Sequence, residues 1–123
     1  MRVLLADDQP KVRAALRLIL EQLKKVEIIE EVVDAKSLID RLEGSNPDLL
    51  LLDWELSGLQ PGLSFNELRS HNQALKVIVL SARISNDQFA PFQSNPPCGA
   101  DAFISKCDPP ERLFATLHAF GTD

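Results

Sequence analysis

The sequence predicts an α/β fold with a five-stranded parallel sheet, and two observations lead to this class. Five short apolar runs alternate along the chain with longer amphipathic segments, as in folds where helices connect parallel strands. Residues 49–52 are consecutive leucines, which suits a strand covered on both faces. No internal repeat or linker breaks the alternation, so we expect one domain over residues 1–123.

The start of the chain contains the first predicted strand and helix. The apolar run at residues 3–6 stops at an acidic pair. Apolar residues then recur at helical spacing over residues 12–23, and Pro10 stands where a first helical turn tolerates proline. Residues 28–33 are expected to form a second strand, less buried than the first because two glutamates interrupt it.

A second helix and the central strand are predicted next. Apolar residues between 38 and 42 indicate a short helix, with Asp34 or Ser37 as its N-cap and Gly44 closing it. The leucine run then forms the central strand, which is followed by Asp53.

The second half of the chain continues the same alternation. It predicts a third helix near residues 63–68 and strands at 77–80 and 102–105. It also predicts a final helix that starts at Pro109-Pro110 and carries an apolar stripe over residues 113–120. The fourth helix is expected to be short or irregular, because prolines interrupt helices. The prolines concerned are Pro91, Pro96 and Pro97.

Composition and charge narrow the class of protein. The formal net charge of -5 disfavours nucleic acid as a direct partner, because phosphate binding needs a basic face. The apolar runs are too short to cross a bilayer, and no charged-then-apolar leader opens the chain. Cys98 and Cys107 are too few for a disulfide framework and lack metal-ligand spacing. We therefore expect a cytoplasmic protein with no membrane partner.

Polar residues follow four of the predicted strands. Asp7 and Asp8 follow the first, Asp53 the third, Ser81 the fourth and Lys106 the fifth. Ligands of open parallel sheets bind beyond the carboxyl ends of the strands, so these side chains are expected to converge. Three neighbouring carboxylates repel one another unless a cation is present, and Mg²⁺ prefers oxygen ligands. A carboxylate nucleophile beside Mg²⁺ would form an aspartyl phosphate.

At these residues the sequence resembles the receiver domain of two-component response regulators. The resemblance is carried by the segments LLADDQP, LLLLDWE, VIVLSA and GADAFISK, and it covers nearly the whole chain. It implies a flavodoxin-like (βα)5 doubly wound sheet with strand order 2-1-3-4-5. The implied function is that of a phosphoacceptor signalling domain rather than a turnover enzyme.

The resemblance also implies a role for each matching residue. Asp53 would accept a phosphoryl group from a histidine kinase or phosphotransfer protein. Lys106 would pair with the phosphoryl oxygens, and Ser81 and Phe103 would form the switch. The implied Mg²⁺ ligands are Asp8, Asp53 and the Glu55 backbone carbonyl, with Asp7 acting through a water. In this family the fourth helix, fifth strand and fifth helix form the face that meets a downstream effector or a second copy.

Two further side chains border the predicted phosphoryl pocket. Glu55 lies two positions beyond the acceptor and Arg83 two beyond the switch hydroxyl. We hypothesise that they form an ion pair that tunes the phosphoryl lifetime.

Three alternatives remain open. A Mg²⁺-dependent phosphohydrolase also forms an aspartyl phosphate, but its nucleophile usually follows the first strand in a D-x-D arrangement. A flavodoxin-like binding module needs a Ser, Thr or Gly-rich phosphate loop, and Asp7-Asp8-Gln9 has the opposite charge. The third is a degenerate receiver that acts only as a protein-interaction scaffold, which the intact Asp8, Asp53 and Lys106 disfavour.

Overall fold

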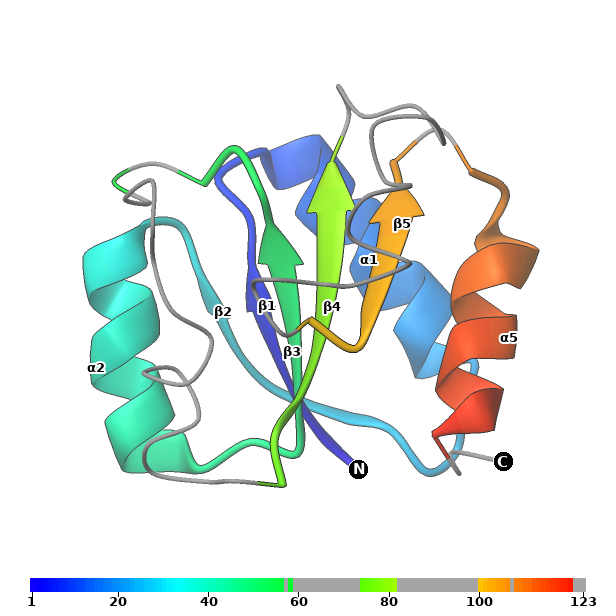
Figure 1. The fold of residues 1–123 in the computed structure, drawn as a ribbon, viewed down its shortest axis with the longest axis horizontal. Coiled ribbons are helices and arrows are strands. Elements are labelled where there is room, and N and C mark those ends of the chain that lie inside the picture. Colours follow the sequence, from blue (N-terminus) through cyan, green and yellow to red (C-terminus); the bar gives the residue numbers. More distant parts are fainter. Residues whose placement is uncertain (57, 59–73, 82–99, 107, 121–123) are drawn as a thin grey trace.

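The computed structural model describes residues 1–56, 58, 74–81, 100–106 and 108–120. Within these ranges eight elements follow one another along the chain (Figure 1). They are β1 (Arg2–Ala6), α1 (Pro10–Glu21), β2 (Glu27–Val32), α2 (Ala35–Ser45), β3 (Leu49–Asp53), β4 (Lys76–Ser81), β5 (Ala102–Ser105) and α5 (Pro110–Ala119). The third and fourth predicted helices, with the prolines that interrupt the latter, lie outside the described residues.

The strands form one parallel sheet in the order β2-β1-β3-β4-β5. Helices α1 and α5 contribute to one apolar cluster against the sheet, and α2 contributes to a second cluster that does not include them. Figure 1 shows α2 apart from α1 and α5, with the sheet between them. The predicted doubly wound flavodoxin-like α/β fold is therefore confirmed.

The central strand is buried along its whole length. All five residues of β3 are buried, and the side chains of its four leucines alternate between the two clusters. Leu50 and Leu52 face the α2 side, whereas Leu49 and Leu51 face the α1 and α5 side. Burying one leucine contributes about 1.5–3 kcal/mol to folding, so this strand anchors both layers.

Helix α2 shows one confirmed prediction and one that is wrong. Asp34 is the N-cap, and its carboxylate accepts a hydrogen bond of 2.7 Å from the Ser37 backbone N–H. Gly44 does not end the helix, because the helix continues to Ser45. Asn46 takes the left-handed C-terminal position instead, at a φ of 49°, a conformation that asparagine tolerates better than most residues.

The strand ends were predicted to within one residue. β2 stops at Val32, and Val33 lies beyond it with 46% of its surface exposed. β5 spans the predicted residues 102–105. Asp53 and Ser81 are the last residues of their strands rather than the first residues after them. Their side chains are thus held by the sheet ladder.

Candidate phosphoacceptor site

The candidate site lies where the parallel strands end, at the edge toward which the arrowheads of β3, β4 and β5 point in Figure 1. Asp7 and Asp8 follow β1, and Lys106 follows β5. Asp53 and Ser81 close β3 and β4. The register explains the convergence, because β4 pairs in parallel with both β3 and β5 and their carboxyl ends align.

The Lys106 side chain bridges two carboxylates at the ends of β1 and β3. Its ammonium lies 2.9 Å from Asp7 Oδ2 and 3.1 Å from Asp53 Oδ1, and its side chain is 9% exposed. The Lys106 backbone N–H donates to the Ser81 carbonyl over 2.9 Å, which fixes the chain direction. Burial lowers the pKa of Lys106, but its hydrogen bonds to Asp7 and Asp53 outweigh burial and the pKa is raised. The ammonium is thus a permanent positive charge in the site.

Asp53 is a buried carboxylate with one oxygen still available. The residue is 1% exposed, and Oδ1 accepts the Glu55 backbone N–H at 3.0 Å. Oδ2 is buried and has no hydrogen-bond partner among the described residues. Burial raises the pKa of Asp53, and the nearby Asp7 carboxylate adds to this effect, while the Glu55 N–H and Lys106 oppose it. Keeping Asp53 charged in this buried position therefore costs free energy, and a bound cation would reduce that cost.

Asp7, Asp8 and Asp53 fit a hard divalent cation. Carboxylate oxygens of all three lie within 4.8 Å of one another. Asp7 is buried, with Oδ1 accepting the Gln9 backbone N–H at 2.8 Å, whereas Asp8 is exposed. Oδ2 of Asp53, which has no hydrogen-bond partner in the described part of the chain, completes an all-oxygen donor set. Mg²⁺ is bound in proteins by one or two carboxylates with open positions for other oxygens.

Ser81 contacts Glu55 rather than the three aspartates. Its hydroxyl donates to the Glu55 carboxylate, with Oγ 2.8 Å from Oε2 and 3.0 Å from Oε1. The Trp54 backbone N–H, which donates to the Leu80 carbonyl over 2.8 Å, ties the chain after β3 to the end of β4. This tie brings Glu55 beside Ser81. The predicted Glu55 partner Arg83 lies outside the described residues, so that ion pair stays a prediction.

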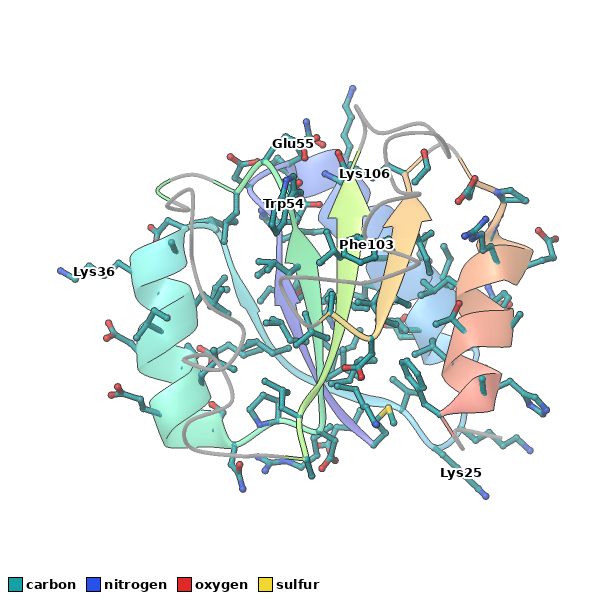
Figure 2. All side chains as sticks on the ribbon, in the orientation of Figure 1. Lys25, Lys36, Trp54, Glu55, Phe103 and Lys106 are labelled. Atoms are coloured by element: carbon teal, nitrogen blue, oxygen red, sulfur yellow. The ribbon has the colours of Figure 1, made fainter. Side chains whose placement is uncertain are left out.

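Phe103 lies inside β5, whereas the other predicted site residues that the structure describes lie at the ends of strands or just beyond them. It is 6% exposed, belongs to the apolar cluster on the α2 side, and sits in β5. Figure 2 shows Trp54, Glu55 and Lys106 near the ends of the strands and Phe103 lower along β5. Its predicted role as a switch residue stays a prediction.

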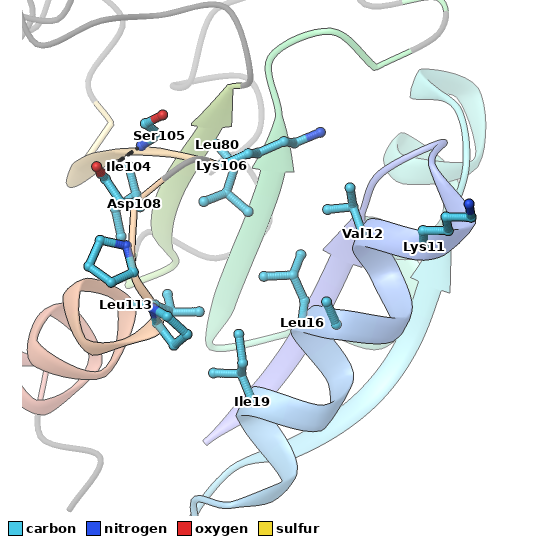
Figure 3. Close-up of a pocket in the computed structure, with 13 residues that line it drawn as sticks. Lys11, Val12, Leu16, Ile19, Leu80, Ile104, Ser105, Lys106, Asp108 and Leu113 are labelled. Carbon is cyan, nitrogen blue, oxygen red and sulfur yellow. Dashed lines mark hydrogen bonds between the residues drawn. The ribbon is translucent and has the colours of Figure 1, made fainter.

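A cavity of about 340 Å³ lies between α1 and α5 beside the site (Figure 3). Its walls are mainly aliphatic, including Val12, Leu16, Ile19 and Leu113, and Lys106 lies at its border. The cavity is separate from the acidic cluster, because none of the three aspartates that form it lines this space.

Two contacts of the site were not predicted from the sequence. Gln9 accepts a hydrogen bond of 3.2 Å from the Lys106 ammonium, and Arg13 donates to the Asp7 carbonyl at 2.8 Å. Gln9 is the N-cap of α1, and Arg13 lies in the first turn of that helix. Their position within five residues of the acidic pair was the available signal, since the first turn of a helix that follows β1 must lie at the same edge.

A phosphoacceptor domain with an acidic, lysine-containing edge is the class that this fold and site define. The family model of the response regulator receiver domain matches residues 3–118. The chain therefore belongs to the response regulator receiver domain family, and the predicted resemblance is confirmed. The comparisons give no support to the phosphohydrolase, flavodoxin-like or scaffold alternatives.

Similar proteins extend beyond the receiver domain. NarP, a nitrate/nitrite response regulator of Escherichia coli K12, is 30% identical over 96% of this chain and 54% of its own length. EvgA of the same strain, named a DNA-binding transcriptional activator, is 28% identical over 97% of this chain and 56% of its own length. The chain thus spans about half the length of these relatives.

Solved structures agree with the fold. The isolated REC domain of RcsB from Salmonella enterica serovar Typhimurium, determined with the phosphomimetic BeF3-, has a TM-score of 0.81 at 25% identity. The match covers 98% of this chain and 87% of the RcsB chain. RcsB bound to the rprA promoter has a TM-score of 0.80 at 25% identity, covering 97% of both chains.

The comparisons with EvgA and RcsB contradict one prediction. Net charge led us to expect no direct nucleic-acid partner, yet relatives of this chain are DNA-binding regulators, one of them solved on promoter DNA. The error is physical: the charge of -5 describes 123 residues, whereas this chain matches only 56% of the length of EvgA. No described helix is long and apolar enough to span a membrane.

Proposed function

We propose that Asp53 is the residue on which this receiver domain accepts its phosphoryl group. The observation that carries the assignment is a buried carboxylate at the end of the central strand, with Oδ2 unpartnered among the described residues and Lys106 3.1 Å from Oδ1. An Asp53 oxygen bonds to phosphorus while the bond from phosphorus to the donor atom breaks. With a phosphohistidine donor, the imidazole nitrogen leaves and takes up a proton.

Lys106 and Ser81 are the proposed partners of the transferred group. The ammonium already bridges Asp7 and Asp53, so it can follow the negative charge as it moves onto the phosphoryl oxygens. Ser81 is the last residue of β4, the strand that pairs with β3. Its hydroxyl would donate to another of the phosphoryl oxygens. Phe103, in the next strand, is proposed to transmit the change.

The proposed metal is Mg²⁺. Asp8, Asp53 and the Glu55 backbone carbonyl would hold it directly and Asp7 through a water, in keeping with the clustered carboxylates. When bound, Mg²⁺ neutralises these carboxylates and the incoming phosphoryl oxygens. The exposure of Asp8 and the burial of Asp7 suit one direct and one indirect ligand.

We also propose the wider setting of the domain. It acts as a phosphoacceptor and not as a turnover enzyme, and it works in the cytoplasm as one unit over residues 1–123. Because relatives are DNA-binding response regulators, its phosphorylation is proposed to control transcription through DNA.

The experiment that tests the assignment is intact-mass analysis after incubation with acetyl phosphate and Mg²⁺. We expect a single phosphoryl adduct on the wild-type chain, with acetate as the leaving group. The Asp53→Asn variant should show none, because an amide oxygen is a far weaker nucleophile. An adduct that persists in Asp53→Asn at the wild-type level would overturn the assignment, and repeated turnover of acetyl phosphate without an adduct would favour a hydrolase.

A further inference from the structure

The Ser81 hydroxyl donates its hydrogen bond to a carboxylate of its own chain. Its oxygen lies within 3.0 Å of both Glu55 carboxylate oxygens, and Ser81 has no exposed surface. A hydroxyl bonded to a charged acceptor in such a setting makes one of the stronger hydrogen bonds of a protein.

A serine hydroxyl carries one proton and so donates one full hydrogen bond. It cannot serve Glu55 and a phosphoryl oxygen on Asp53 at the same time. Glu55 is held next to both residues of the site. Its backbone N–H donates to Asp53 Oδ1 at 3.0 Å, and its carboxylate accepts the Ser81 hydroxyl. Glu55 thus links the acceptor strand to the switch hydroxyl through its own main chain and side chain.

We propose that Glu55 is a positioning residue whose carboxylate holds the Ser81 hydroxyl in the unphosphorylated state and must release it before the phosphoryl group is bound. The inference rests on the proposed function, since it takes Asp53 as the acceptor and Ser81 as the phosphoryl partner. It gives Glu55 a role that differs from the predicted ion pair with Arg83. A ligand that mimics the phosphoryl group is opposed by the free energy of the Glu55–Ser81 bond.

The test is a double-mutant cycle with beryllofluoride and Mg²⁺ as the probe, followed by the fluorescence of Trp54. Glu55→Ala should raise the beryllofluoride affinity about tenfold, the equivalent of about 1.4 kcal/mol. Glu55→Gln should give a smaller gain, roughly threefold, because a neutral amide oxygen accepts more weakly than a carboxylate. In a Ser81→Ala background the Glu55→Ala gain should shrink to less than about twofold, because no hydroxyl remains to be released.

Glu43→Gln provides a matched control, since it removes a carboxylate from an exposed position on α2, an element that contributes none of the site residues. It should leave the beryllofluoride affinity unchanged. Equal gains from Glu55→Ala in both backgrounds would show general charge repulsion and overturn the proposal. No gain, or a loss of affinity, in the single Glu55→Ala variant would also overturn it.

A second measurement separates this inference from the proposed function. This measurement is urea unfolding, without metal or beryllofluoride, of the wild type, Glu55→Ala, Ser81→Ala and the variant that carries both substitutions. It reports whether Glu55 and Ser81 are energetically coupled in the folded protein. Absence of coupling there would overturn the proposal whatever the acceptor is. The assignment of Asp53 fails on a different result, namely beryllofluoride binding to Asp53→Asn as tight as to the wild type.

Discussion

Leu52 and Asp53 are neighbours in β3 and are almost equally buried, with 0% and 1% of their surfaces exposed. Leu52 gains free energy from leaving water, as does every apolar residue in the middle of the sheet. Asp53 loses hydration of its charge, and its pKa rises chiefly for that reason. Within one strand, burial therefore stabilises the fold at the sheet centre and destabilises it at the carboxyl edge.

The difference shows how the fold places chemistry. The sheet centre is a set of interlocking aliphatic side chains on both faces, and it fixes the backbone up to the last residue of each strand. The edge uses that rigidity to hold Asp7, Asp53 and Lys106 together, although like charges there repel. Strain of this kind persists only where the surrounding structure over-determines the positions.

The largest effect on stability is expected from the sheet centre. Leu50→Ala removes a fully buried side chain from the α2-side cluster and should lower the free energy of unfolding by about 2–5 kcal/mol. Urea denaturation measures the change. Leu18→Ala is the matched control, because Leu18 is 65% exposed on α1 and should change stability by less than about 0.5 kcal/mol. Similar losses in both would show that burial does not set the contribution of leucines here.

Lys106 should come next, because it is the positive charge between two buried carboxylates. Lys106→Met leaves them uncompensated and should cost about 2 kcal/mol near neutral pH, below the roughly 3–5 kcal/mol of a fully buried pair. The cost is reduced because Lys106 lowers the pKa of Asp53, and without it Asp53 takes up a proton more readily. Urea denaturation at pH 7 and pH 4 should therefore show a smaller loss at the lower pH. A loss independent of pH would show that packing of the lysine stem, not its charge, matters.

Asp53→Asn should have the opposite sign to the two variants above. In the folded state the pKa of Asp53 is raised above the usual 3.8, so the group favours folding below that value and loses this contribution as the pH rises through the raised pKa. Replacing the carboxylate by an amide removes the loss. Without Mg²⁺ the variant should be more stable than the wild type by about 1 kcal/mol at pH 7. Thermal unfolding of both proteins at pH 4 and pH 7 checks this, and a variant less stable at pH 7 would contradict it.

The sequence predicted the fold and most of the site because both follow from local patterns. Strands end where apolar runs end, so the residues after them had to share an edge, and this located Asp7, Asp53 and Lys106 together. The contact of Ser81 with Glu55 was not predictable in the same way. It depends on how the chain after β3 packs on the end of β4 through the Trp54 N–H, which no residue pattern encodes.

Two other errors have similar physical origins. Gly44 was expected to end α2 because glycine takes the left-handed conformation most easily, yet Asn46 adopts it at a φ of 49°. Two residue types can take that conformation, and the sequence alone did not decide between them. Charge failed as a guide to nucleic acid because it measures one domain, whereas this chain matches only 56% of EvgA, which is named a DNA-binding transcriptional activator.

The smallest effect is expected at the start of α2, away from both regions. The Asp34 carboxylate caps the helix through the Ser37 backbone N–H, and that hydrogen bond lowers its pKa below the usual 3.8. The group therefore stabilises the fold above its unfolded pKa and loses this contribution as the pH falls through the lowered value. Asp34→Ala should lower the thermal midpoint by a few degrees at pH 7, while Asp34→Asn, which also caps helices well, should stay near the wild type. The wild type and the Asp34→Asn variant should then diverge only on acidification, when the wild type loses its charged cap and the variant keeps its neutral one. Equal acid sensitivity in the two proteins would show that the capping carboxylate contributes nothing through its charge.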